Sequence, residues 1–224
     1  MDTHDHDNLS PDDFAAGGRA GVLAGGAAID ALTHAILNEK NSPDILSYRG
    51  EVVAELQAAV SRQDEAVEDL ERNPTAEMRR MVYNLELKRI RYLLRLYLRT
   101  RLHKLERMAA YVLANEDLLE RLSPAEQRFT QDYFVMAGQH LTHSVLNSLP
   151  DGFKDLLKSH PIEELDDLVA TPAVDTHVFC SILEDVGSVQ LDEDQVVDMK
   201  QGDLFIVRYE AVRDLVQTGQ AVLV

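Results

Sequence analysis

The sequence lacks several features that point to particular classes of protein. It has no tryptophan and a single cysteine, Cys180, in 224 residues. One cysteine excludes an internal disulfide and a zinc site built from cysteines, and it suits a reducing compartment. Neither a P-loop pattern, G-x-x-x-x-G-K-[ST], nor a nucleophile elbow, G-x-S-x-G, occurs. No apolar run approaches the roughly 20 residues needed to span a bilayer. We therefore expect no enzyme, no catalytic or cofactor-binding residue, no cofactor and no membrane contact.

Histidine pairs are the remaining candidates for a metal site. His140 and His143 lie three residues apart on a predicted helix, and His4 and His6 alternate with aspartates near residue 1. His140 and His143 have no third ligand at a useful spacing, and a zinc site needs three or four protein ligands, so we interpret them as surface or packing residues. The residues His4 to Asp7 could bind a metal weakly, but a solvated tail is the preferred interpretation. We therefore expect no metal.

Basic charge is scarce except in one window. The chain has 22 Lys and Arg residues against 39 Asp and Glu residues, a net charge of −17 at pH 7, which argues against a free-standing nucleic-acid-binding protein. Ten of the 22 basic residues nevertheless lie between Met78 and Arg107, where only Glu86 and Glu106 are acidic. This window therefore carries +8, which leaves −25 for the rest of the chain.

Apolar spacing predicts that the first part of the chain is helical. Apolar residues recur at helical intervals over 29–40 and 51–72, and no Gly or Pro interrupts residues 75–114, where we predict one unusually long helix. Ser123-Pro124-Ala125-Glu126 forms a capping-box pattern with Pro at the first helical position, which predicts a further helix to about residue 148.

After residue 159 the pattern changes from helical to β-rich. Residues 159–172 contain two prolines and an acidic run, which predict a linker. Turn residues then separate five short β-rich segments, at 174–183, 188–191, 195–199, 204–209 and 221–224. The predicted fold class is mainly α with a small β-domain. Its parts are a flexible tail (1–27), a bundle of four to five helices, one of them long (28–158), the linker (159–172) and a five-stranded β-domain (173–224).

The long predicted helix has more apolar surface than one face can hold. At 100° per residue, Lys88, Arg91, Arg95 and Arg99 form a basic strip roughly 80° wide, and apolar residues occupy nearly all of the remainder. An ordinary surface helix has one apolar stripe a little over 100° wide. This helix must therefore contact neighbours on two or more sides.

Two basic residues fall inside the apolar sector of this helix. Arg101 lies near Ile90 and Leu94 on the wheel, and Lys104 lies in a neighbouring apolar part. An unpaired buried guanidinium costs several kcal/mol, so Arg101 should have a carboxylate partner. That carboxylate belongs either to the same chain or to another subunit, and the sequence leaves both open. We expect Arg101→Ala to weaken assembly or solubility more than Arg95→Ala.

The basic strip leaves an alternative function open. Four basic residues at helical spacing can neutralise DNA phosphates, which would make the chain a helical nucleic-acid-binding module. The net charge of −17 opposes this alternative, and a solvated or internally paired strip is the commoner arrangement.

The same helix carries a family resemblance. Residues 91–106, RYLLRLYLRTRLHKLE, fit the pattern R-x-x-L-x-x-Y-L-R-x-R-L-x-K-[IL]-E and closely resemble the signature helix of the Sld-five type of GINS subunit (subunit four). Residues 38–46, NEKNSPDIL, resemble the family's N-E-K-x-x-P-[ED]-[IL]-L, and Leu122 to Glu126 resembles its L-S-x-x-E. Residues 202–224 resemble its closing strand, helix and C-terminal strand. These matches follow the family's order and cover nearly all of 29–224.

The resemblance implies a function without catalysis. GINS is a heterotetramer of related subunits, and in this subunit type the helical domain precedes the small β-domain. The chain would be a scaffold subunit that acts in initiation and elongation of DNA replication, in the nucleus. Its partners would be the three other GINS subunits and, through the complex, the MCM helicase ring and Cdc-forty-five. Contact with DNA would be indirect or weak.

The resemblance also suggests residues that form the helical core and the partner contacts. On the long helix these are Ile90, Arg91, Tyr92, Leu94, Tyr97, Leu98, Arg99, Arg101, Leu102, Lys104, Leu105 and Glu106. In the β-domain they are Phe205, Tyr209, Val222 and Leu223.

Overall fold

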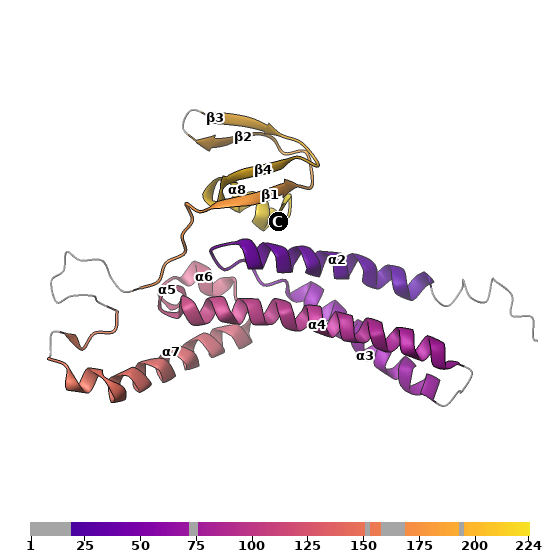
Figure 1. The fold of residues 1–224 in the computed structure, drawn as a ribbon, viewed down its shortest axis with the longest axis horizontal. Coiled ribbons are helices and arrows are strands. Elements are labelled where there is room, and N and C mark those ends of the chain that lie inside the picture. The colour runs from indigo at the N-terminus through magenta and orange to yellow at the C-terminus, as the bar shows by residue number, and fades with distance from the viewer. Residues whose placement is uncertain (1–18, 72–75, 151–152, 158–168, 193–194) are drawn as a thin grey trace, which may run out of the picture. The chain divides into compact units, whose positions relative to one another are not determined.

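A computed structural model describes residues 19–71, 76–150, 153–157, 169–192 and 195–224 (Figure 1). The described residues up to 150 form the helices α2 (Arg19–Asn41), α3 (Gly50–Glu71), α4 (Glu77–Arg107), α5 (Ala109–Leu113), α6 (Glu116–Glu120) and α7 (Pro124–Ser144), and the 3-10 helix η2 (Leu146–Ser148). The chain divides into two compact units, one drawn from 1–33 and 51–94, the other from 34–50 and 95–224. None of the described helices is long and apolar enough to cross a bilayer.

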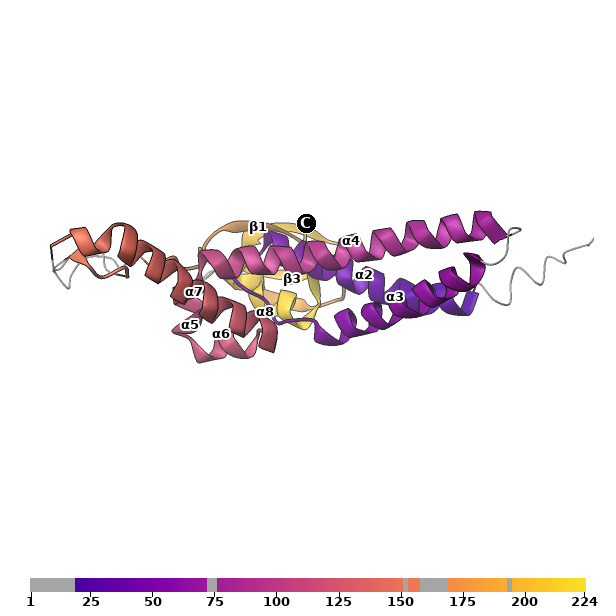
Figure 2. The same ribbon diagram turned by 90° about the horizontal axis from the view of Figure 1, so that it is seen from below.

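The long helix is confirmed, although it ends earlier than predicted. α4 has 31 residues and forms one unbroken coil, with α3 alongside its first half (Figure 2). It ends at Arg107 because Met108 leaves the helical conformation, with φ −117° and ψ 22°. No Gly or Pro marks this break. Met108 instead packs with Leu105, Val112 and Leu118 in a buried cluster, so tertiary packing turns the chain into α5.

Two helix termini bear on the sequence predictions. The capping box before α7 is confirmed, because the Ser123 hydroxyl accepts a hydrogen bond from Glu126 N and the Glu126 carboxylate accepts one from Ser123 N. α2 begins at Arg19, so residues 19–27, which we expected in the tail, are helical. Glycines lower helix propensity there, but no proline ends the Ala-rich helix. Residues 1–18 lie outside the described part of the chain.

The β-domain contains the five predicted strands, arranged in two sheets. These are β1 (His177–Ile182), β2 (Gly187–Asp192), β3 (Gln195–Met199), β4 (Leu204–Arg208) and β5 (Ala221–Leu223), with α8 (Tyr209–Thr218) before β5. An antiparallel sheet has the order β4-β1-β5, with Cys180 opposite both Phe205 and Leu223, and β2 pairs with β3. Gly219 ends α8 with φ 84°, a left-handed conformation that favours glycine.

Side chains from the strands and from α8 form the core of the β-domain. Cys180, Ile182, Val212 and Leu223 are among its fully or almost fully buried residues. Leu46, which precedes α3 by a few residues, belongs to the same core. A residue of the helical part therefore contributes directly to the interior of the β-domain.

Candidate functional site

The two sides of α4 differ in solvent exposure. On one side Ile90, Leu94, Tyr97, Arg101 and Leu105 recur every three to four residues and are at most 8% exposed. This spacing places them on a single face, which the chain's own core covers.

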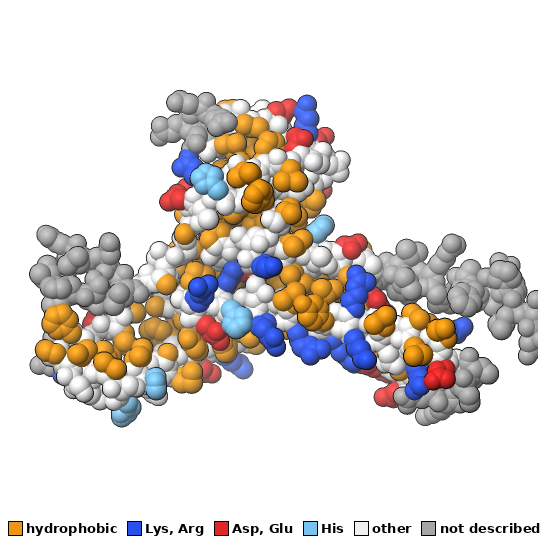
Figure 3. Space-filling model, in the orientation of Figure 1, with side chains coloured by type: hydrophobic (Ala, Val, Ile, Leu, Met, Phe, Trp, Pro, Cys, Tyr) orange, Lys and Arg blue, Asp and Glu red, His pale blue; other side chains and the backbone are white. Residues whose placement is uncertain are grey.

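The opposite side of α4 is apolar and exposed. Met78, Met81, Val82, Leu85 and Tyr92 are 56–76% exposed, and we call these five residues the uncovered stripe. Figure 3 shows hydrophobic side chains next to Lys and Arg side chains over the surface of α4. The helix therefore has apolar surface on two sides; that a neighbour covers the exposed side stays a prediction.

Arg101 is the centre of a buried ion cluster, formed with Lys104, Glu39 and Glu126. Its guanidinium is fully buried and donates two hydrogen bonds to the Glu126 carboxylate, at 2.7 Å from Nε and 3.2 Å from Nη2. Its Nη1 donates to Glu39 Oε2 at 2.9 Å and to the Leu46 carbonyl at 2.7 Å. One planar fork thus ties α4 to α2, to α7 and to the segment that leads to α3.

Aromatic rings and a second cation complete the surroundings of Arg101. The Tyr48 and Tyr97 rings lie 5.5 and 5.7 Å from its guanidinium carbon, within cation–π range. Lys104 Nζ donates to Glu39 Oε1 at 3.0 Å, to Ser42 Oγ at 2.8 Å and to the Asp44 carbonyl at 2.7 Å.

The pKa values of the two cations of the cluster shift in opposite directions. Burial alone would lower the pKa of Arg101, but the hydrogen bonds to Glu126 and the charge of Glu39 outweigh it, so this pKa is raised and Arg101 stays charged. Burial dominates for Lys104, whose pKa is lowered even though Glu39 opposes the shift. Arg101 donates three hydrogen bonds to carboxylates and Lys104 donates one, so the guanidinium makes more of the charged contacts in the cluster.

The carboxylate partners of Arg101 belong to the same chain. The sequence left open whether the partner lies in this chain or in another subunit, and Glu39 and Glu126 decide the question for these contacts. Sequence reasoning singled out neither residue as a partner. A signal was present, since Glu39 lies in the NEKNSPDIL motif and Glu126 closes the capping box.

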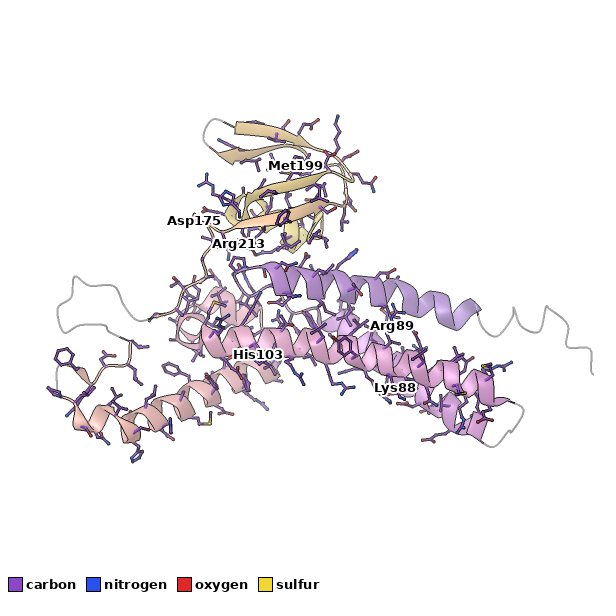
Figure 4. The ribbon with its side chains drawn as sticks, in the orientation of Figure 1. Lys88, Arg89, His103, Asp175, Met199 and Arg213 are labelled. Atoms are coloured by element: carbon purple, nitrogen blue, oxygen red, sulfur yellow. The ribbon has the colours of Figure 1, made fainter. Side chains whose placement is uncertain are left out.

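Next to the ion cluster, residues 38–46 bind the β-domain, and we call this contact the junction. The Asn38 side-chain oxygen accepts a hydrogen bond from Leu223 N in β5 at 2.8 Å. The Tyr209 hydroxyl donates to Asp44 Oδ1, and Nη2 of Arg213, which is labelled in Figure 4, lies 2.9 Å from Asp44 Oδ2. Burial and the Asp44 charge raise the pKa of Tyr209, which keeps its hydroxyl protonated as a donor.

The Asp44–Arg213 contact is an ion pair without hydrogen-bond alignment. Within the described part of the chain, Asp44 Oδ2 and Arg213 Nε have no hydrogen-bond partner. Asp44 is 2% exposed, and the positive charges of Arg213 and Arg121 compensate its burial together with the Tyr209 hydroxyl. Glu39 joins the ion cluster while Asn38 and Asp44 join the junction, so one short segment holds both.

The structure distributes the predicted contact residues between the interior and the surface. Buried on the long helix are Ile90, Leu94, Tyr97, Arg101 and Leu105; Leu98, Leu102, Lys104 and Glu106 are half-buried; Arg91, Tyr92 and Arg99 are exposed. In the β-domain, Tyr209, Val222 and Leu223 are buried, and Phe205 is half-buried. Their roles in contacts with other subunits stay predictions.

The basic strip and the histidines are on the surface. All four strip residues, Lys88, Arg91, Arg95 and Arg99, are exposed, and Arg91 pairs with Asp64 of α3. His140 and His143 are exposed on α7. Among the residues that the structure describes, no group of three or more His, Cys, Asp or Glu side chains is placed to hold a metal ion.

The order of the parts, a helical bundle and then a small β-domain that closes with a strand, helix and strand, agrees with known protein families. Residues 51–143 match the GINS complex protein helical bundle domain, and residues 172–224 match the C-terminus of DNA replication complex GINS protein SLD5. The class of protein is therefore a subunit of the GINS complex.

Individual relatives agree on the type of subunit. The DNA replication complex GINS protein SLD5 of Arabidopsis thaliana is 34% identical over 215 residues, which cover 93% of this chain and 97% of the relative. The proteins of that name in Schizosaccharomyces pombe (27% identical; 84% and 87% covered) and Homo sapiens (26% identical; 91% and 92% covered) are also similar. The chain belongs to the SLD5 family of GINS proteins, which acts in DNA replication, and the resemblance found in the sequence is confirmed.

Proposed function

We propose that this chain is a non-catalytic scaffold subunit of a heterotetrameric GINS complex. In this proposal it assembles with three other GINS subunits and acts in the nucleus. Through the complex it takes part in the replicative helicase assembly with the MCM ring and Cdc-forty-five, during initiation and elongation of DNA replication. Family membership supports the partnership with other GINS subunits.

The observation that carries the proposal is the uncovered stripe of α4. Five large apolar side chains are more than half exposed on one helix whose other face the chain's own core already covers. Contiguous exposed apolar surface of this kind is typical of protein interaction sites. The ion cluster and the junction add rigidity, because they fasten α2, α4, α7 and the β-domain through residues 38–46.

Co-expression tests this proposal. The chain should co-purify with the three other GINS subunits as a complex with one copy of each, measured by native mass spectrometry. Expressed alone, it should aggregate or remain poorly soluble because the stripe is exposed. A chain that is monomeric and soluble alone, unfolds cooperatively and has no affinity for those subunits would contradict the proposal.

The basic strip is exposed, so the alternative function, binding of nucleic acid, can be tested with variants of the strip. Lys88 and Arg99 are both exposed on α4, as phosphate contacts require. If the strip binds DNA, the charge reversals Lys88→Glu and Arg99→Glu together should abolish binding and flatten its dependence on salt. Unchanged binding by this double variant would remove the alternative.

A further inference from the structure

Several hydroxyl residues of the chain are directly followed by proline, the dipeptide that proline-directed protein kinases phosphorylate. They are Ser10, Ser42, Ser123 and Thr171. A kinase needs an exposed hydroxyl on a segment that its cleft can take up, so the fold selects among these residues. Ser10 lies outside the described part of the chain, and the other three differ in their surroundings.

Two of the three described hydroxyls are held by hydrogen bonds within the fold. Ser42 is 4% exposed, and its Oγ donates to the Asp44 carbonyl at 3.1 Å and accepts from Lys104 Nζ at 2.8 Å. Ser123 is half-buried as the N-cap of α7, and its Oγ accepts from Glu126 N. Phosphorylation of either hydroxyl would first require contacts of the ion cluster or of the capping box to break.

Thr171 is exposed, in the segment that leads into β1 (Figure 1). Residues 169–173 belong to no helix or strand. Pro172 disfavours the helical conformation at Thr171 and favours an extended backbone there, which is how substrate peptides bind in kinase clefts. Of the three sites that the structure describes, Thr171 alone is exposed, so it is the one that a kinase can reach without unfolding the chain.

An exposed arginine lies near this threonine. Residues 169–170, which directly precede Thr171, line a groove of about 230 Å³ beside α5 and α7, and Arg107 lines the same groove. Arg107 is exposed, and no carboxylate among the described residues pairs with it. Glu106, which also lines the groove, lies 3.2 Å from His103. A phosphate carries about −1.5 to −2 charges at pH 7 and its oxygens match the fork of a guanidinium, so Arg107 is placed to bind one on Thr171.

We infer that Thr171 is the acceptor of a proline-directed protein kinase and that its phosphate pairs with Arg107. In this reaction the Thr171 hydroxyl oxygen attacks the γ-phosphorus of Mg²⁺-bound ATP. The bond from that phosphorus to the β,γ-bridging oxygen breaks, ADP leaves, and the hydroxyl proton passes to the catalytic aspartate of the kinase. The new phosphate fastens residues 169–171 to the end of α4, so phosphorylation orders the segment that leads into the β-domain.

Phosphorylation of the GINS complex in vitro tests the acceptor. The complex that contains the full chain is incubated with MgATP and a mitogen-activated protein kinase, and peptide mass spectrometry gives the phosphate occupancy of each residue. We expect the occupancy of Thr171 to exceed that of Ser42 and Ser123, the matched Ser-Pro controls, roughly fivefold or more, which is the population cost of losing an N-cap. Thr171→Ser should still be phosphorylated. An unphosphorylated Thr171, or equal occupancy at Ser123, would overturn the inference.

Hydrogen exchange tests the pairing with Arg107. Phosphorylation should slow exchange at the Val174 and Thr176 amides roughly two- to fivefold, the strength of an exposed ion pair, because both amides donate hydrogen bonds directly after the fastened residues. Arg107→Gln should abolish this slowing. Arg128→Gln, at an exposed position of α7 outside the groove, should leave it unchanged. Slowing that survives Arg107→Gln, or no slowing in the wild type, would overturn the pairing.

Discussion

Replacing Arg101 by methionine tests the ion cluster directly, because methionine keeps an unbranched apolar stem and removes every donor. Glu39 and Glu126, whose side chains are 1% and 5% exposed, would lose their shared partner. Lys104 would still pair with Glu39, so Glu126 would be the carboxylate left without a positive partner. Removing one partner of a buried ion pair costs about 3–5 kcal/mol, since the remaining charge stays buried and uncompensated.

A loss of this size is large beside the stability of a typical domain, about 5–15 kcal/mol. For a chain of this length it corresponds to a fall in melting temperature of about 10 °C. Arg99→Met is the matched control, because Arg99 is exposed two residues earlier on the same helix, and we expect it to change stability by less than about 0.5 kcal/mol. Both variants are compared by thermal and urea unfolding in the GINS complex. Equal melting temperatures for the two variants would refute the reasoning.

Four further substitutions test the junction and two helical glycine positions. Tyr209→Phe should cost about 1–3 kcal/mol at pH 7, because Asp44 loses a donor. The pKa of Tyr209 is raised above its ordinary 10.0, so the stability that its protonated hydroxyl contributes is complete below pH 10 and is lost as the pH rises further. Urea unfolding between pH 7 and 11 should therefore show that the free energy of unfolding falls less steeply with pH in Tyr209→Phe than in the wild type. Asn38→Ala should speed hydrogen exchange at the Leu223 amide, which loses its buried acceptor, and unchanged exchange would contradict the hydrogen bond. Gly219→Ala should lower the free energy of unfolding by about 1–2 kcal/mol, and with it the melting temperature, because φ is 84°. Gly26→Ala, with open space on a helix, should raise the melting temperature.

What the sequence predicted about Arg101 depended on local properties alone. Helical periodicity placed Arg101 among apolar residues, and the cost of an unpaired buried charge then required a carboxylate. Its partners could not be predicted, because Glu126 and Glu39 are 25 and 62 residues away and no local pattern encodes such distances. The family motifs that contain both glutamates were visible, but nothing in their spacing indicated that they meet at one guanidinium.

Two further features of α4, the residue at which it ends and the faces that the rest of the chain buries, also could not be predicted from local sequence. Without Gly or Pro near Met108, propensity predicts a continuous helix, and only the packing of Met108 with Val112 and Leu118 interrupts it. Similarly, the wheel showed that the long helix has too much apolar surface for one neighbour. Which residues the chain covers itself depends on tertiary contacts, and these leave Met81 and Leu85 exposed while burying Leu94.

An uncharged version of the ion cluster would separate its effect on stability from its effect on positioning. Glu39→Met, Arg101→Met and Lys104→Met, combined with Glu126→Gln to keep the capping box, remove all buried charge from the cluster. Apolar replacements of buried ion pairs are often neutral or stabilising by about 1–4 kcal/mol, so this variant should unfold no more easily than the wild type. Directional contacts from Glu39 also hold residues 38–46 in place, and this segment binds the β-domain. We therefore expect faster hydrogen exchange at the Leu223 amide despite undiminished stability. If that amide exchanges as slowly as in the wild type, apolar packing alone positions the junction, and the charges have no part in orienting the β-domain.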